Sequence, residues 1–178
     1  MTIADIQMRL AVLSDVDAIA VAHRDSIQTL GAAYYPPSVV DDWQTGLTGD
    51  VYRKAMDDGE VFFIATGTVD GEPVILGFAS DYSIDERKHG TSVYVRGVAA
   101  RRGIGSALLR IAEDHAVARG ATSVHVEASL AGVEFYKANG FIEVSRGETR
   151  LTSGRPIACV FMRKDLKGMT KAARRGDI

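Results

Sequence analysis

Cysteine is almost absent from this sequence, which has one, Cys159, among its 178 residues. A single cysteine excludes an internal disulfide and a multi-cysteine metal cluster, and this scarcity is typical of proteins from a reducing compartment. Cys159 sits in an apolar run from Ile157 to Met162, so we expect a buried structural thiol rather than a reactive one. We expect no bound metal.

Proline and long apolar stretches are also scarce. The 4 prolines, 46% hydrophobic and 25% charged residues are typical of a globular protein, not of disorder or a fibrous repeat. No window approaches the ~20 apolar residues that a membrane span requires, and the start of the sequence lacks a basic segment followed by an apolar one. We therefore expect a soluble, cytoplasmic protein with no membrane partner.

A strong excess of charge of either sign is missing as well. The net charge of −2 argues against a general nucleic-acid binder, which normally presents a strongly basic face. Basic residues gather locally at Arg101 and Arg102 and in the tail at Lys171, Arg174 and Arg175. We expect no nucleic-acid partner, and a length suited to one domain over residues 1–166 followed by a polar tail over 167–178.

Hydrophobic periodicity and turn signals predict an alternation of strands and helices. The dipeptide Asp70-Gly71 is a strong hairpin signal, because both positions tolerate positive φ. The predicted strands cover 7–12, the two runs between 61 and 82, 91–99, 123–127, 141–144 and 157–163. The predicted helices cover 14–31, two short segments between 34 and 58, 103–119 and 132–139, with a polar loop over 83–90.

One strand-to-helix turn has the features of an anion site, namely Arg101-Arg102-Gly103-Ile104-Gly105-Ser106. The N–H groups of a helix's first turn are free, and the helix dipole favours negative charge there. Glycine at two positions lets the backbone approach a ligand closely. The turn is neither a P-loop nor a dinucleotide fingerprint. The alternative is a tight turn carrying two solvated arginines.

The residues around this turn resemble the GNAT superfamily of N-acetyltransferases. The run from Val93 to Leu109 is similar to the family's acetyl-CoA motif, a strand followed by Gln/Arg-x-x-Gly-x-Gly/Ala and a helix. The run from Ala128 to Phe141, ending Phe-Tyr-Lys-Ala-Asn-Gly-Phe, resembles its second motif. Ala100 departs from the family's Gln/Arg, Gly97 stands where proline is common, and Ser129 stands where many members have asparagine.

The resemblance implies an α/β (α+β) fold with a central, mostly antiparallel seven-stranded sheet and helices on both faces. It implies transfer of an acetyl group from acetyl-CoA to a primary amine by direct attack in a ternary complex. Tyr136 falls where the family places the tyrosine that protonates the departing thiolate. The implied cofactor contacts are Val93, Val95, Arg101, Arg102, Gly103, Ile104, Gly105, Ser106 and Ser129.

The general base and the acceptor stay open at this point. Asp81, Glu127 or an ordered water are the candidates for the base, and we expect the four histidines, His23, His89, His115 and His125, to be structural. Tyr34, Tyr35 and Trp43 either line a pocket for an amine with an apolar body or cover the core. The acceptor is a small molecule or a peptide amine, and a homodimer is expected. A non-catalytic acyl-CoA-binding or regulatory module with the same fold is the alternative function.

Overall fold

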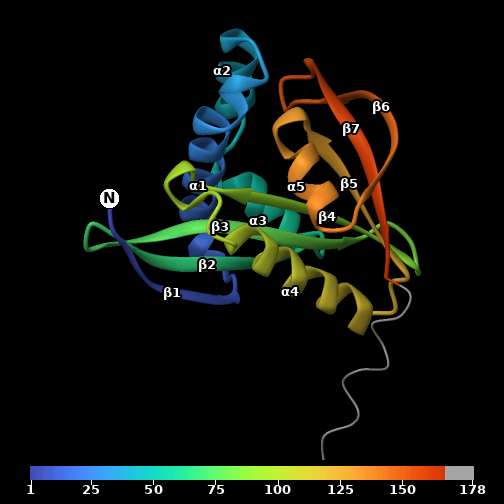
Figure 1. The fold of residues 1–178 in the computed structure, drawn as a ribbon, viewed down its shortest axis with the longest axis horizontal. Helices are drawn as coiled ribbons and strands as arrows, with labels where there is room; N and C mark the ends of the chain where they lie inside the picture. Colours follow the sequence, from blue (N-terminus) through green and yellow to red (C-terminus); the bar gives the residue numbers. More distant parts are fainter. Residues whose placement is uncertain (167–178) are drawn as a thin grey trace, which may run out of the picture.

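The computed structural model describes residues 1–166, so the predicted tail over 167–178 lies outside the described residues. Within residues 1–166 the sheet has seven strands in the order β1-β2-β3-β4-β5-β7-β6 (Figure 1). The strands are β1 Ile3–Leu10, β2 Val61–Val69, β3 Glu72–Ser83, β4 Lys88–Val95, β5 Ser123–Ser129, β6 Ile142–Arg150 and β7 Pro156–Asp165. The helices are α1 Val16–Thr29, α2 Pro37–Thr45, α3 Gly49–Asp57, α4 Ile104–Ala118 and α5 Val133–Ala138.

Strand pairing is mostly antiparallel, as the sequence predicted. The β4/β5 pair is parallel, and the other neighbouring pairs of the described sheet are antiparallel. The β2–β3 hairpin turns at Asp70 and Gly71, where φ is 51° and 91°. Positive φ at both central positions matches the right-handed twist of the flanking strands, which is why this dipeptide closes a two-residue turn.

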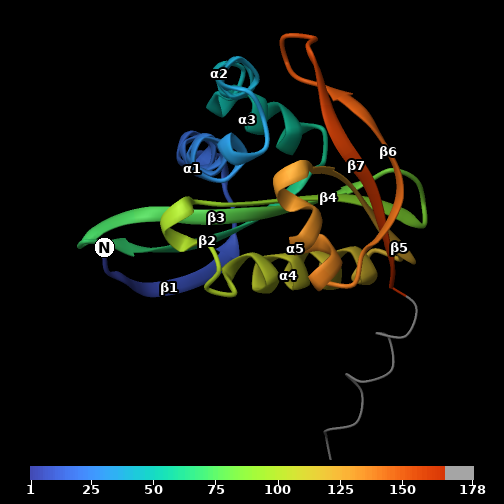
Figure 2. The ribbon, with the colours of Figure 1, turned by 45° about the horizontal axis from the view of Figure 1, so that its top comes forward.

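Helices cover both faces of the sheet, which confirms the predicted layers (Figure 2). On one face, α1 and α3 bury an apolar stripe that includes Ile19, Ala20 and Tyr52 against Phe62 and Phe78 of the sheet. On the other face, α4 packs against β2, β3 and β4, and its buried positions follow helical spacing at Ile104, Leu108 and Ala112. Helix α5 packs with β5 and β7 in another apolar cluster, which also includes Leu109 and Ala116 of α4.

Several strand bounds differ from the sequence prediction. The strand predicted over 7–12 is Ile3–Leu10, and the strand predicted over 141–144 extends over Ile142–Arg150. The strand predicted over 91–99 begins at Lys88 and ends at Val95, because Asp25 of α1 accepts hydrogen bonds from the Gly97 N–H and from Nε of Arg96. These bonds turn the chain out of the sheet. The loop predicted over 83–90 shrinks to 84–87, since Asp85 accepts from the N–H groups of Arg87 and Lys88 and closes a tight turn.

Candidate active site

A cleft opens in the middle of the sheet where β4 and β5 separate. Their parallel pairing ends with Gly90 opposite His125, whereas β4 continues to Val95 and β5 to Ser129. The Tyr82 ring packs directly on Gly90, where a Cβ atom would collide with it. The resulting cleft has a volume of about 750 Å³ and is lined by both strands and by α4 and α5.

The glycine-rich turn forms one end of this cleft. Arg101 and Gly103 adopt φ of 58° and 78°, and Gly103 is the residue immediately before α4. A Cβ at Gly105 would lie 3.1 Å from Cε2 of Phe135, so this position has no room for a side chain without movement. The lining residues of the turn are Ala99, Ala100, Arg101, Gly103, Gly105 and Ser106.

Two residues of the turn, Arg102 and Ile104, do not line the cleft. Arg102 is exposed and Ile104 is buried in the apolar core under the sheet. The aligned peptide dipoles of α4, which is 15 residues long, place partial positive charge at the turn. Arg101, which lines the cleft here, adds a cationic side chain. This end of the cleft therefore suits a negatively charged group such as a phosphate.

Tyr136 lies near the middle of the cleft. Its side chain is 4% exposed, held between the rings of Phe135 and Phe141 at centroid distances of 5.0 and 5.2 Å. Its hydroxyl oxygen accepts a hydrogen bond of 3.0 Å from the Val93 N–H of β4. Burial, with the neighbouring Tyr94, raises the pKa of Tyr136 above its ordinary value. The phenol is therefore protonated at neutral pH, as an ordinary tyrosine also is.

Tyr94 is a site residue that the sequence analysis did not single out. Val93 and Val95 pack toward α4, so strand alternation sends the Tyr94 side chain to the opposite face, against α1. Its ring stacks on the imidazole of His23 with 3.6 Å between centroids. Alternation along β4 was the available signal for Tyr94.

His23 of α1 packs against the ring of Tyr94. It is 8% exposed, and its Nδ1 lies 2.6 Å from the hydroxyl oxygen of Tyr52. Burial lowers the pKa of His23 to about 3, so the ring is neutral at physiological pH. The imidazole therefore packs as an uncharged ring in the core, in agreement with the expected structural role.

A smaller cavity of about 200 Å³ adjoins the cleft on the side of α2 and the β6–β7 hairpin. The two cavities share Trp43, Tyr94, Glu127 and Ser129. Tyr35 and Cys159 also line the smaller cavity. Cys159 is buried, as predicted, and burial, with Glu127 second, raises the pKa of its thiol. The smaller cavity thus combines aromatic walls with a carboxylate at its junction with the cleft.

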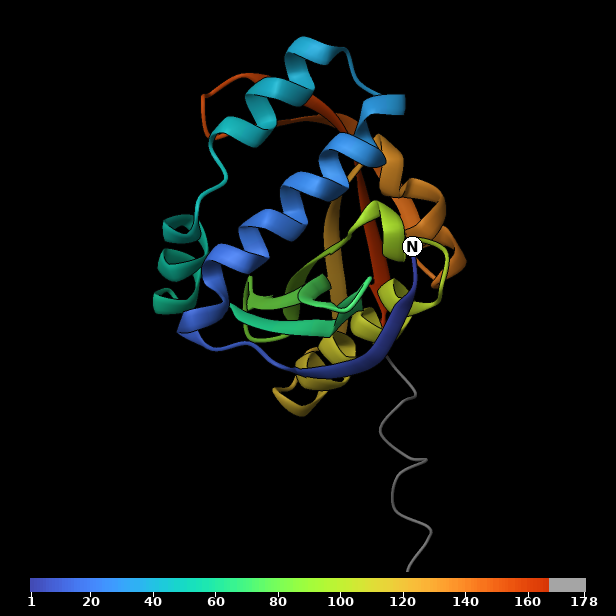
Figure 3. The same ribbon diagram turned by 90° about the vertical axis from the view of Figure 1, so that its left-hand side faces the viewer.

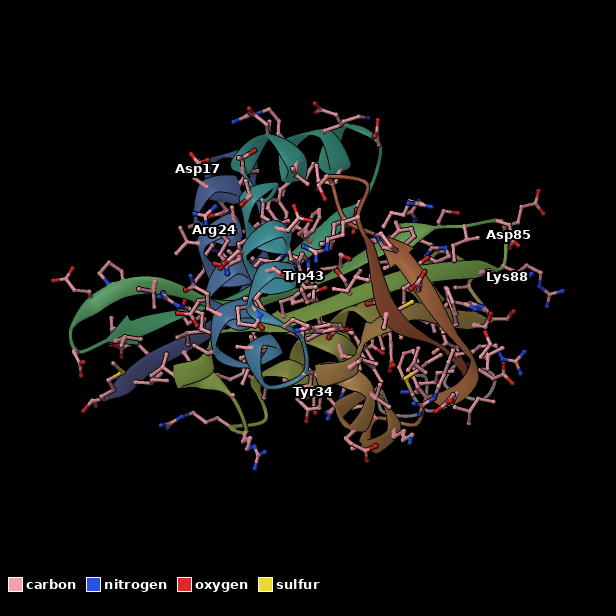
Figure 4. All side chains as sticks on the ribbon, turned by 90° about the horizontal axis from the view of Figure 1, so that it is seen from above. Asp17, Arg24, Tyr34, Trp43, Asp85 and Lys88 are labelled. Atoms are coloured by element: carbon pink, nitrogen blue, oxygen red, sulfur yellow. The ribbon has the colours of Figure 1, made fainter. Side chains whose placement is uncertain are left out.

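The three aromatic residues predicted to line a pocket for the acceptor or to cover the core do not all line the same cavity. Tyr35 and Trp43 line the smaller cavity, whereas Tyr34 is 55% exposed and borders the larger cleft. Both Tyr34 and Trp43 lie on the helical layer above the sheet (Figure 4). The smaller cavity is therefore bounded by two of the three, together with Tyr94.

Asp81, one of the candidate bases, lies in the packing between the sheet and α4. It is 1% exposed, and its oxygens accept hydrogen bonds from Nδ1 of His89 at 2.6 Å and of His115 at 2.7 Å. This carboxylate therefore ties β3, β4 and α4 together. Of the two candidate carboxylates, Glu127 is the one that lines the cleft.

Replacing Asp81 with alanine is expected to lower the free energy of unfolding by about 3 kcal/mol, because the buried His89 and the half-buried His115 lose their acceptor. Urea unfolding measures this change. The exposed Asp114 of α4 provides the control, and Asp114→Ala should change stability by less than about 0.5 kcal/mol. An Asp81→Ala protein as stable as the control would contradict the structural role.

Comparison with known protein families identifies the family to which the chain belongs. Residues 32–166 match the family described as "Acetyltransferase (GNAT) domain", which is most of the chain. The chain therefore belongs to the GNAT family of N-acetyltransferases. A search of curated protein sequences found no match.

Solved structures show the same fold. A GCN5-related N-acetyltransferase from Rhodopseudomonas palustris is 26% identical with a TM-score of 0.76, covering 93% of this chain and 99% of that one. The PaiA N-acetyltransferase of Thermoplasma acidophilum, solved with coenzyme A, is 19% identical with a TM-score of 0.66 over 90% and 99% of the two chains. The YncA protein of Salmonella typhimurium, solved with acetyl-CoA, is 20% identical with a TM-score of 0.62 over 92% and 95%. Among the helices of residues 1–166, none has the length and apolar character needed to cross a membrane.

Proposed function

We propose that this protein transfers an acetyl group from acetyl-CoA to a primary amine by direct attack in a ternary complex. One observation supports this proposal: the glycine-rich turn, Tyr136 and Glu127 line the same cleft between β4 and β5. Holding two reactants on one surface in a productive orientation replaces a bimolecular encounter with an effectively unimolecular step.

The residues present fit the proposed co-substrate. The turn from Arg101 to Ser106 would hold the pyrophosphate through N–H groups and the Arg101 side chain. The Val93 carbonyl and the backbone groups of Val95 would bond the amide groups of the pantetheine arm in the opening between the strands, since the Val93 N–H already donates to the Tyr136 hydroxyl. Ser129 borders the same space. Ala100 supplies no side-chain donor, so backbone N–H groups carry the phosphate contacts.

The chain supplies both proton-transfer groups. When bound, acetyl-CoA supplies a thioester carbonyl that a neutral amine can attack. Glu127 lies between the cleft and the aromatic cavity, where it accepts a proton from the incoming ammonium, directly or through one water. Tyr136, protonated at neutral pH as an ordinary tyrosine is, donates its proton to the departing sulfur. The one proton that Glu127 removes from the amine is thus matched by the one proton that Tyr136 delivers to the thiolate.

The test is calorimetric titration with acetyl-CoA of wild type and Gly103→Trp, followed by an amine-transfer assay. Gly103 has positive φ with open space where a Cβ would stand, and Gly59 has the same properties outside the cleft lining. Both tryptophans strain the backbone alike, and only the one at 103 obstructs the turn. We expect micromolar binding by wild type and Gly59→Trp, and at least tenfold weaker binding by Gly103→Trp.

Two outcomes would overturn parts of this proposal. If wild type does not bind acetyl-CoA, the assignment of the cleft is wrong and the enzymatic proposal falls with it. Binding without transfer to any primary amine would instead favour the alternative, a non-catalytic acyl-CoA-binding or regulatory module with the same fold.

A further inference from the structure

The segment that leads from β4 into the glycine-rich turn is anchored to α1. Oδ1 of Asp25 accepts a hydrogen bond of 2.8 Å from the Gly97 N–H, and Oδ2 accepts one of 3.2 Å from Nε of Arg96. We call these two bonds the Asp25 clamp. The chain continues from Gly97 to Ala99 as one turn of 3₁₀ helix. Figure 3 shows this turn beside the C-terminal half of α1.

Gly97 also lets the two segments approach closely. A Cβ at this position would lie 2.6 Å from Oγ1 and 2.7 Å from Cβ of Thr29, in the last turn of α1. Thr29 is itself held, because its Oγ1 donates to the Asp25 carbonyl oxygen at 2.7 Å. A proline at position 97 would fix the backbone locally, but it has no N–H to donate and carries a Cβ. Here a tertiary bond from α1 restrains the backbone instead.

Only a short, ordered path separates the Asp25 clamp from the glycine-rich turn. The Ala99 N–H donates to the Arg96 carbonyl oxygen at 2.9 Å, and the Ala100 N–H donates to that of Gly97 at 3.2 Å. The Ala99 side chain is buried in the apolar cluster that also holds the start of α4. Arg101 follows with a φ of 58°, a conformation that a non-glycine residue keeps only where its surroundings hold it. A shift at Gly97 would therefore move the turn.

The Asp25 clamp also sets the spacing between two walls of the cleft. Thr29 and Leu30, at the end of α1, line the cleft, and Ala100 and Arg101 line it as well. Asp25 itself lies outside the lining. The side chains of Asp25 and Arg96 are 26% and 22% exposed, so salt screens this pair less than a fully exposed one. Asp25 can thus act on a ligand through the turn and not by contact.

We infer that Asp25 is a positioning residue for acetyl-CoA, which fixes the place and the backbone conformation of the glycine-rich turn before the co-substrate binds. This inference rests on the proposed function, because the turn is there proposed to hold the pyrophosphate. A turn that is already ordered presents its N–H groups without a further loss of backbone entropy on binding. Loss of the clamp therefore weakens acetyl-CoA binding and leaves the proton-transfer groups Glu127 and Tyr136 in place.

Calorimetric titration of the full chain with acetyl-CoA tests this inference in Asp25→Ala. We expect Kd to rise about 20-fold, while kcat at saturating acetyl-CoA and KM for the amine stay within about threefold of wild type. Asp15→Ala is the matched control. Asp15 stands at the start of α1, accepts from the Val12 N–H and from Arg9, and lies outside the cleft lining. Its loss should lower the melting temperature and leave Kd within about twofold of wild type.

A second variant and a second measurement make the test independent of activity. Asp25→Asn keeps an oxygen acceptor for the Gly97 N–H, so its Kd should rise only about fivefold; it carries the comparison if Asp25→Ala does not fold. Hydrogen exchange reports directly on order in the turn. Without ligand, the amides of residues 97–106 should exchange at least about fivefold faster in Asp25→Ala than in wild type or Asp15→Ala.

The possible outcomes separate this inference from the proposed function. Equal Kd values in wild type and the folded Asp25 variants, or unchanged exchange over residues 97–106, overturn the positioning role alone. Equal losses of affinity in Asp25→Ala and Asp15→Ala indicate a general effect of stability and also overturn it. Absence of binding by wild type overturns the proposed function and, with it, the role of Asp25 toward acetyl-CoA.

Discussion

Tyr136→Phe is expected to lower kcat for acetyl transfer by about 10²- to 10³-fold, while the dissociation constant for acetyl-CoA changes less than about threefold. The phenylalanine ring keeps the contacts with Phe135 and Phe141 and removes the proton donor for the departing thiolate. The Val93 N–H loses its acceptor in this variant, which should cost about 1 kcal/mol of stability. Steady-state kinetics, calorimetry and urea unfolding separate the three effects.

Tyr52→Phe is the matched control for this experiment. Tyr52 is also 4% exposed and its hydroxyl is also hydrogen-bonded, to His23, but it lies outside the residues that line the cleft. Loss of the Tyr52 hydroxyl should lower the free energy of unfolding and leave kcat within about twofold of wild type. Equal losses of kcat in the two variants would contradict proton donation by Tyr136 and indicate a packing effect.

Glu127→Gln is expected to lower kcat/KM by about 100-fold at pH 7. Glutamine keeps the shape of the side chain and cannot accept the proton of the ammonium. The deficit should shrink as the pH rises toward the pKa of an alkyl amine, about 10, because solution then supplies the neutral amine. A pH profile of kcat/KM for wild type and variant measures both the loss and its recovery.

Glu148→Gln separates proton acceptance from a general effect of charge. Glu148 is an exposed carboxylate of β6 whose charge, like that of Glu127, raises the pKa of Cys159, where burial is the main cause. Its removal should change kcat/KM less than twofold if the role of Glu127 is chemical. A pH-independent deficit in Glu127→Gln, matched by Glu148→Gln, would show that the cavity needs negative charge and that the base lies elsewhere.

The fold and the glycine-rich end of the cleft were within reach of the sequence because their signals are local. Asp70 and Gly71 define a hairpin through their own φ angles. Gly103 and Gly105 define a turn through the absence of a Cβ, and α4 shows its buried face within a few residues. Such features depend on neighbours in the chain, so a single sequence displays them.

The acceptor side depends on contacts between distant segments, and no local pattern encodes it. Ser153 meets Asp42 and Arg155 meets Ser38 across more than a hundred residues. Asp81 has the same sequence appearance as an exposed strand-end acid, and only the packing of α4 brings His115 to it. Only the tertiary structure shows that Glu127 lines the cleft and that Asp81 does not.

The hydrogen bond between Val93 and Tyr136 links folding with turnover. Because the protein itself supplies a partner for the phenol, the Tyr136 side chain adopts one orientation while the chain folds. Its loss of rotational entropy belongs to the folding free energy, and no ligand has to order this ring. In the proposed mechanism, each encounter with substrate then begins with a preorganised proton donor in the middle of the cleft.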